Sequence, residues 1–202
     1  MEKCFVIGLT GGSGSGKSEV AKILSGLGAI HINADKVARE VSDEPATLSA
    51  LREAFGDVVL DENGKYARKR LAQIAFNDRE FLEKLSHITH RFIVERITEQ
   101  IETIKRTTTG RLVVLDAPIP VERGFRDVSD EIWVVTADRD IRIQRIIDRD
   151  GISKQEAESR INSQMSDEEY QSLADRLIVN NGDWDMLKQN ILEGFYEIVY
   201  KK

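Results

Sequence analysis

Residues 11–18 read Gly-Gly-Ser-Gly-Ser-Gly-Lys-Ser and match the pattern G-x-x-x-x-G-K-[ST] at every fixed position. In this pattern the glycines let backbone N–H groups converge on phosphate oxygens, the lysine reaches the outer phosphates, and the serine hydroxyl binds magnesium. The loop therefore predicts a site for ATP or a similar triphosphate with Mg²⁺. The residues expected at this site are Gly12, Ser13, Gly14, Ser15, Gly16, Lys17 (catalytic), Ser18 (metal ligand) and Glu19.

The residues on either side of the loop supply the context that the pattern requires. Residues 4–9 form an apolar run typical of a buried strand, and residues 17–27 carry apolar side chains at helical spacing. The helix N-terminus then faces the phosphates, where its dipole favours negative charge. A flexible Gly/Ser linker is disfavoured because it would not lie between such elements. A dinucleotide fingerprint is excluded because Lys17 or Glu19 occupies the position of its third glycine.

Composition narrows the class of protein further. The chain has 202 residues, a net charge of 29 − 35 = −6 and one cysteine, Cys4. An acidic protein is a poor candidate for non-specific nucleic-acid binding, and a single thiol cannot form an internal disulfide. No apolar run approaches the roughly 18 residues of a membrane span. We therefore expect a cytoplasmic protein, monomeric or weakly homo-oligomeric, that binds small molecules rather than nucleic acid or membrane.

The order of predicted elements indicates an α/β fold. Short apolar runs at residues 29–32, 112–115, 132–135 and 177–179 predict further strands, with helical patterns between them. This alternation predicts a P-loop NTPase core of three α/β/α layers around a five-stranded parallel sheet. Ligands of such sheets bind at the carboxyl ends of the strands.

Two segments depart from the strand–helix alternation. Residues 44–110 carry helical signals and one turn, which predicts a helical insertion with a second, acceptor-binding surface. Residues 138–167 are strongly charged and are expected to form a mobile lid. The nucleotide-binding core then comprises residues 1–43, 111–137 and 168–202.

Two aspartates follow predicted strands and are candidates for chemistry. Asp35 lies at the edge of the sheet that carries the loop, where a carboxylate can accept a proton from an acceptor hydroxyl. It also precedes a helical pattern, so a role as helix N-cap is equally open. Asp116 ends the strand at residues 112–115, where a carboxylate can complete a magnesium shell or simply occupy a turn.

Basic residues gather in two places. Arg142, Arg145 and Arg149 share one face of a predicted helix, where guanidinium groups could neutralise a transferring phosphoryl group or form a solvated surface. Residues 68–70 read Arg-Lys-Arg and could bind the phosphates of an anionic acceptor, although short charge runs are often only solvated. The histidines lack the spacing of a zinc site.

Taken in order, these segments resemble the dephospho-CoA kinase family over nearly the whole chain. The matching segments are residues 7–18, 34–39 (A-D-x-x-A-R), 64–76, 118–122, 145–150, 160–164 and 181–182. The resemblance implies transfer of the ATP γ-phosphoryl group to the ribose 3′-hydroxyl of dephospho-CoA. It further implies Asp35 as the base, and Arg145 and Arg149 as lid residues. The residues that it implies for the acceptor are Asp35, Arg39, Arg68 and His87.

The sequence departs from the family pattern at four positions. Glu19 stands where threonine is usual, and Asn33 replaces a common aspartate. Ile88 replaces a proline, and Pro120 interrupts the family's P-L-L-x-E segment. Each departure bears on affinity or acceptor choice, and none removes Lys17.

Other functions fit parts of the sequence. A P-loop kinase of nucleosides or nucleotides would share the loop, whereas the cluster around Arg68 and the long insertion favour a larger anionic acceptor. A GTP-dependent switch would need N-K-x-D to recognise guanine, and the sequence has no Asn-Lys pair. A transport ATPase would need L-S-G-G-Q, which residues 24–28 match only in part.

Overall fold

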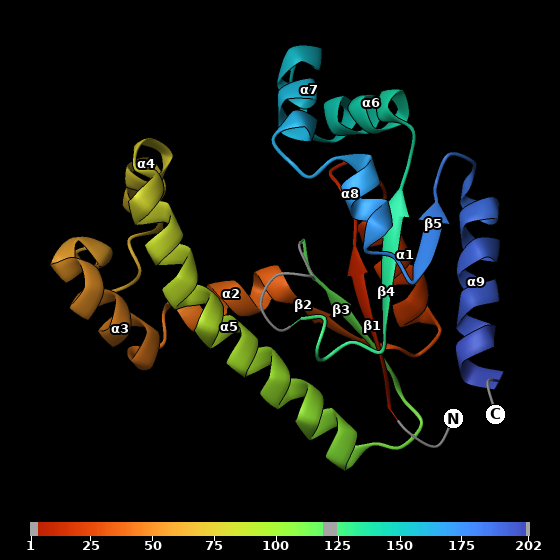
Figure 1. Cartoon of the computed structure of the whole chain (residues 1–202), viewed down its shortest axis with the longest axis horizontal. Helices are drawn as coiled ribbons and strands as arrows, with labels where there is room; N and C mark the ends of the chain where they lie inside the picture. The colour runs from red at the N-terminus through yellow and green to blue at the C-terminus, as the bar shows by residue number, and fades with distance from the viewer. Residues whose placement is uncertain (1–3, 119–124, 201–202) are drawn as a thin grey trace. The chain divides into compact units, whose positions relative to one another are not determined.

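The computed structural model describes residues 4–118 and 125–200 (Figure 1). The chain divides into two compact units, one formed by residues 1–32 and 101–202 and the other by residues 33–100. The first unit carries the glycine loop and nearly all of the sheet, and the second is mainly helical.

The sheet has five strands in the order β2-β3-β1-β4-β5. β1 pairs in parallel with β3 and β4, and β4 pairs in parallel with β5, which confirms the predicted parallel α/β fold. β1 is central, and Val6, Ile7 and Leu9 are fully buried in it, as expected for a strand covered on both faces. The strands are β1 (Phe5–Thr10), β2 (Ile30–Asn33), β3 (Leu112–Asp116), β4 (Glu131–Thr136) and β5 (Arg176–Val179).

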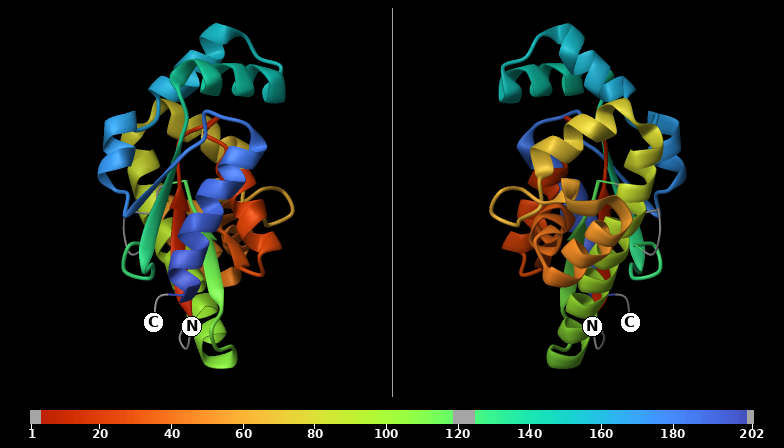
Figure 2. Two further views of the ribbon diagram at one scale, coloured as in Figure 1. Left: turned by 90° about the vertical axis from the view of Figure 1, so that its right-hand side faces the viewer. Right: turned by 90° about the vertical axis from the view of Figure 1, so that its left-hand side faces the viewer.

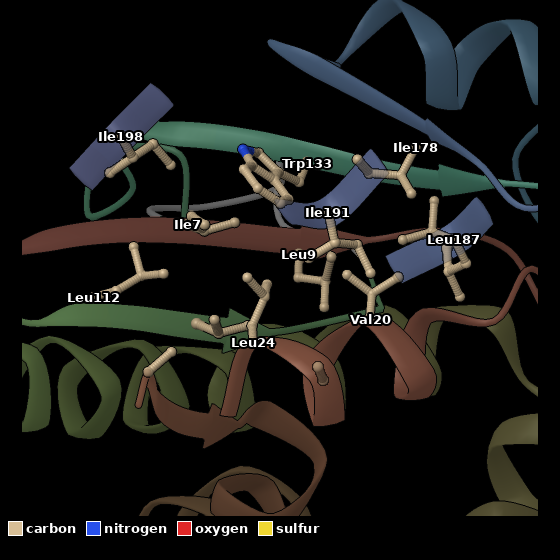
Figure 3. Packing of buried hydrophobic residues seen from close by; sticks show 14 residues of the cluster. Ile7, Leu9, Val20, Leu24, Leu112, Trp133, Ile178, Leu187, Ile191 and Ile198 are labelled. Carbon is tan, nitrogen blue, oxygen red and sulfur yellow. The ribbon is translucent and has the colours of Figure 1, made fainter. Parts of the chain in front are cut away.

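Helices α1 (Lys17–Gly26) and α9 (Trp184–Tyr200) pack side by side on one face of the sheet (Figure 2). Figure 3 shows Val20 and Leu24 of α1 in one apolar cluster with strand residues and α9. Burial of each such side chain contributes roughly 1.5–3 kcal/mol. Gly194 allows close packing of α9, because a β-carbon there would lie 2.7 Å from the Trp133 ring. This core fixes α1, and with it the end of the glycine loop.

The other face of the sheet is covered in part by the short helix α8 (Asp167–Ser172), whose Tyr170 packs on Ile132 and Val134 of β4. Helices α6 (Arg139–Asp150) and α7 (Lys154–Asn162) form a separate apolar cluster with each other. α6 is capped at its C-terminus by Gly151, whose φ of 66° lies in the left-handed region that favours glycine, and α7 begins with a capping box between Ser153 and Glu156.

The second unit contains α2 (Ala34–Ser42), α3 (Pro45–Phe55), the 3₁₀ helix η1 (Gly56–Val59), α4 (Arg68–Asn77) and most of α5 (Arg79–Thr107). Its buried cluster is formed by Leu51, Val59, Leu71 and Leu85. Helices make up most of residues 44–110. The structure adds an isolated antiparallel bridge between Leu60 and Tyr66, which closes the predicted turn. Among the described residues, no helix combines the length and apolar character needed to cross a membrane.

Candidate active site

The loop between β1 and α1 has backbone geometry that requires glycine. Gly14 and Gly16 have φ angles of 78° and 96°, in the left-handed region that favours glycine. A β-carbon on Gly14 would lie 2.6 Å from the Arg142 carbonyl oxygen, and one on Gly16 would lie 2.1 Å from Asn180 Nδ2. Gly16 is also the N-cap of α1, and the first amides of a helix have no carbonyl one turn earlier. These amides and the helix dipole make the loop an anion site.

Side chains from distant segments hold the loop in this shape. Gln164 Oε1 accepts a hydrogen bond from the Ser13 amide at 2.8 Å, and Gln164 Nε2 lies 3.1 Å from Ser13 Oγ. Asn180 Nδ2 donates to the Ser15 carbonyl oxygen at 2.8 Å. These roles of Gln164 and Asn180 were not predicted from the sequence. Asn180 directly follows the fifth predicted strand and Gln164 ends the segment 160–164 that resembles the family, but neither position indicates a contact with the loop.

Lys17 and Asp116 meet next to the loop. The Lys17 ammonium group donates a hydrogen bond to Asp116 Oδ1, and His31 Nε2 lies 3.4 Å from Asp116 Oδ2. Asp116 is 6% exposed, at the end of β3 and in register with Leu9 of β1. Parallel pairing thus brings a carboxylate to the edge of the sheet that carries the loop.

The donor set at the loop fits magnesium bound jointly with a polyphosphate. The described residues contain no cluster of three or more His, Cys, Asp or Glu side chains placed to hold a metal ion. Mg²⁺ commonly takes only one or two protein oxygens and fills its shell with water and substrate phosphates. The exposed Ser18 hydroxyl and the Asp116 carboxylate are hard oxygen ligands of this kind.

The arginines of α6 have different environments. Arg142 is buried, with 2% exposure, which contradicts a purely solvated face. Arg145 is half-buried beside the loop, with Nη1 3.4 Å from the Gly14 carbonyl oxygen and Nη2 3.5 Å from Asn180 Oδ1. These long contacts leave the Arg145 guanidinium available to a ligand phosphate.

Arg149 is directed toward Asp150 instead of the loop. Its Nε and Nη2 atoms donate to the two Asp150 carboxylate oxygens, each at 2.8 Å. Arg160 of α7 also donates to Asp150. The hydrogen bond from Arg149, followed by that from Arg160, lowers the pKa of Asp150 from 3.8 to about 2.

In the second unit, Asp35 and Arg39 lie exposed on α2. The N-cap of α2 is Asn33, whose side chain accepts a hydrogen bond from the Lys36 amide at 2.8 Å. The capping interpretation of Asp35 is therefore wrong, because Asn33 is the residue that caps α2. Asp35 occupies the first turn, where a carboxylate complements the helix dipole.

Arg68 begins α4, with its guanidinium 5.2 Å from the centre of the Tyr66 ring. Arg68, Lys69 and Arg70 line a cavity of about 350 Å³ in the second unit. His87 lies exposed on α5. The basic run is thus part of a concave surface and does not lie on a flat helix face.

The structure accounts for three of the departures from the family pattern. Glu19 accepts a hydrogen bond from Lys22 at 2.8 Å and is half exposed, so its carboxylate is neutralised within α1. Asn33 caps α2, and Ile88 packs against the apolar cluster of the second unit. Pro120 lies outside the described residues, as does most of the segment 118–122.

Comparison with known proteins identifies the family of the chain. A family model described as dephospho-CoA kinase matches residues 5–185. A dephospho-CoA kinase from Moorella thermoacetica is 40% identical over 196 residues, covering 96% of this chain and 92% of that protein. A crystal structure from Thermus thermophilus has a TM-score of 0.79 at 27% identity, covering 98% of this chain and 99% of that one.

Two further structures define the extent of the similarity. Dephospho-CoA kinase from Campylobacter jejuni has a TM-score of 0.72 at 26% identity, and 98% of each chain is covered. Shikimate kinase from Acinetobacter baumannii shares the fold alone, with a TM-score of 0.53 at 16% identity over 100% of this chain and 96% of that one. The chain is a P-loop kinase and belongs to the dephospho-CoA kinase family.

Proposed function

We propose that this protein transfers the γ-phosphoryl group of ATP to the ribose 3′-hydroxyl of dephospho-CoA, giving coenzyme A and ADP. The observation that carries the proposal is the family match over residues 5–185, which spans the glycine loop, the predicted helical insertion and the predicted lid. The acceptor is the one that this family's name implies. The alternative of a nucleoside or nucleotide kinase shares the loop but gives no reason for the basic cavity at Arg68.

In this proposal the protein acts mainly by positioning and charge, as phosphoryl transfer requires. The amides at the start of α1 and the Lys17 ammonium group bind the β- and γ-phosphates. Arg145 neutralises charge that develops on the transferred group. Magnesium, held through Ser18 and Asp116, would neutralise the phosphate oxygens.

The acceptor side is assigned to the second unit. Asp35 accepts the proton of the 3′-hydroxyl, and the cationic side chains of Arg39 and Arg68, with His87, bind the anionic acceptor. Residues 138–167 form the lid, with Arg149 as a further nucleotide contact. We also propose a cytoplasmic location, which the single cysteine supports. The protein is further proposed to be a monomer or a weak homo-oligomer.

An ADP-release assay tests the proposal. We expect turnover with ATP and dephospho-CoA that requires Mg²⁺, and little turnover with adenosine, AMP or shikimate as acceptor. Equal or faster turnover on one of these acceptors would contradict the proposed substrate. GTP binding far tighter than ATP binding, without turnover of any acceptor, would favour a nucleotide-dependent switch.

A further inference from the structure

Arg142 of α6 is a buried charged side chain beside the glycine loop. It is 2% exposed and is among the largest fully buried side chains of the described chain. Arginine is almost never buried without partners, because removing its charge from water is costly. A role as a solvated surface charge therefore cannot explain the position of Arg142.

The guanidinium group of Arg142 binds two segments at once. Its Nε donates to the Ser13 carbonyl oxygen at 2.9 Å, and its Nη1 donates to the Asp167 carboxylate at the start of α8. Its Nη2 is buried and has no hydrogen-bond partner among the described residues. A β-carbon on Gly12 would lie 2.4 Å from this Nη2. The guanidinium thus fills the space directly against the first half of the loop.

Ser13 is fixed on both sides of its backbone. Arg142 holds its carbonyl group, and Gln164 Oε1 accepts from its amide at 2.8 Å. The turn itself is closed by a hydrogen bond from the Ser15 amide to the Gly12 carbonyl oxygen at 3.2 Å. The amide of Ser13 is committed to Gln164, so the amides that face a phosphate must come from later residues. Their direction depends on how this turn is held.

We propose that Arg142 is a positioning residue of the phosphate site, which fixes the turn from Gly12 to Ser15 so that the following amides converge on the polyphosphate. A loop that is already ordered loses less conformational freedom when it binds its ligand. The planar guanidinium of arginine suits this role, because its nitrogen atoms can donate to Ser13 and to Asp167 in two different directions. The ammonium group of lysine is a single point charge on a flexible chain and cannot make both contacts in the same geometry. The inference rests on the proposed function only in assigning a nucleotide phosphate to the loop.

The test measures nucleotide affinity apart from stability and acceptor turnover. We would prepare R142K, R142Q and Q164A, with R139Q as the control, since Arg139 is an exposed arginine of the same helix. For each variant we would measure the Kd for ADP by calorimetry, the thermal midpoint, and KM for dephospho-CoA. R142K and R142Q are expected to raise the Kd for ADP about tenfold or more, while KM for dephospho-CoA stays within about twofold.

Arg142 and Gln164 both hydrogen-bond to Ser13, and two further expected results follow from this. R142Q and Q164A should combine with less than additive effect on the Kd for ADP, because both release the same turn. R139Q should bind ADP like the wild type. A purely structural role would lower the thermal midpoint and leave the Kd of the folded protein unchanged.

A Kd for ADP within about twofold of wild type in folded R142K and R142Q would overturn the proposal. If R142Q does not fold, R142K and Q164A decide the matter by the same criterion. Failure of the proposed function gives a different result: the wild type would bind ADP but would not phosphorylate dephospho-CoA.

Discussion

The Lys17 ammonium group donates a hydrogen bond to the Asp116 carboxylate beside the glycine loop. The two side chains are only 19% and 7% exposed, so this ion pair is poorly screened by water. It comes from the first residue of α1 and the last residue of β3. The pairing holds the cation at the edge of the sheet, next to the end of the loop.

Replacement of Lys17 by alanine tests the role of this cation. We expect Lys17→Ala to lower kcat by on the order of a hundredfold or more, because a charge aimed at the phosphates is lost. The fold should survive, since Lys17 does not belong to the apolar core. Steady-state kinetics and circular dichroism check both points. Lys105→Ala, at an exposed lysine near the end of α5, is the control. Wild-type turnover in Lys17→Ala would contradict the assignment of the loop.

Substitutions of Asp35 and Asn33 distinguish the role of the proposed base from that of the helix cap. Asp35→Asn should lower kcat much more than it raises KM for ATP, because it removes a proton acceptor and no nucleotide contact. Asn33→Ala should instead lower the free energy of unfolding by about 1 kcal/mol, because the side chain that caps α2 is lost. Kinetics and urea unfolding of both variants distinguish the roles. An unchanged kcat in Asp35→Asn would remove it as the base.

Arg145 and Arg149 of α6 should differ in their importance for turnover. Arg145 lies beside the Gly14 carbonyl, whereas Arg149 is bound to Asp150. Arg145→Ala is therefore expected to lower kcat/KM for ATP on the order of a hundredfold, and Arg149→Ala by clearly less. The ratio of the two losses in one steady-state assay is the measurement. A larger loss in Arg149→Ala would mean that Arg149 leaves Asp150 to bind the nucleotide.

We expect the packing of α6 and α7 to lose stability in acid, because Asp150 accepts hydrogen bonds from Arg149 of α6 and Arg160 of α7. Its pKa is lowered from 3.8 to about 2, first by the hydrogen bond from Arg149 and then by that from Arg160. Because the carboxyl pKa is lower in the folded state than in the unfolded state, the ionised carboxylate stabilises the fold at any pH above the ordinary pKa of 3.8. This stabilisation is lost as the pH falls from 3.8 through about 2. A carboxyl-carbon NMR titration should show this low midpoint, and Arg149→Gln should raise it. A wild-type midpoint near 3.8 would contradict the ion pairs.

Local sequence patterns predicted the sheet well. Apolar runs located all five strands to within a residue or two. The signal was strongest for β1, β3 and β4, because a strand buried on both faces excludes most polar side chains. The ends were less exact: the strand predicted for residues 112–115 continues to Asp116, because its pairing with Leu9 extends one residue further. Such pairing depends on the neighbouring strand and leaves no local signal.

The side chains that support the loop were harder to predict. Arg142 lies in a charge-rich helix, and its spacing with Arg145 suggested a common exposed face, yet tertiary packing buries it against Ser13. Gln164 and Asn180 reach the loop from far along the chain, so helical or strand periodicity cannot reveal their partners. Asp35 was placed correctly at the start of α2, but the cap proved to be Asn33.

The most direct test of the central claim is the fate of the γ-phosphoryl group. ATP labelled at the γ-phosphate would be incubated with the wild-type protein, Mg²⁺ and dephospho-CoA, and the products separated and located by mass spectrometry and NMR. We expect stoichiometric ADP, and coenzyme A labelled only on the ribose 3′-phosphate. Label released as inorganic phosphate, or found on another position of the acceptor, would contradict it.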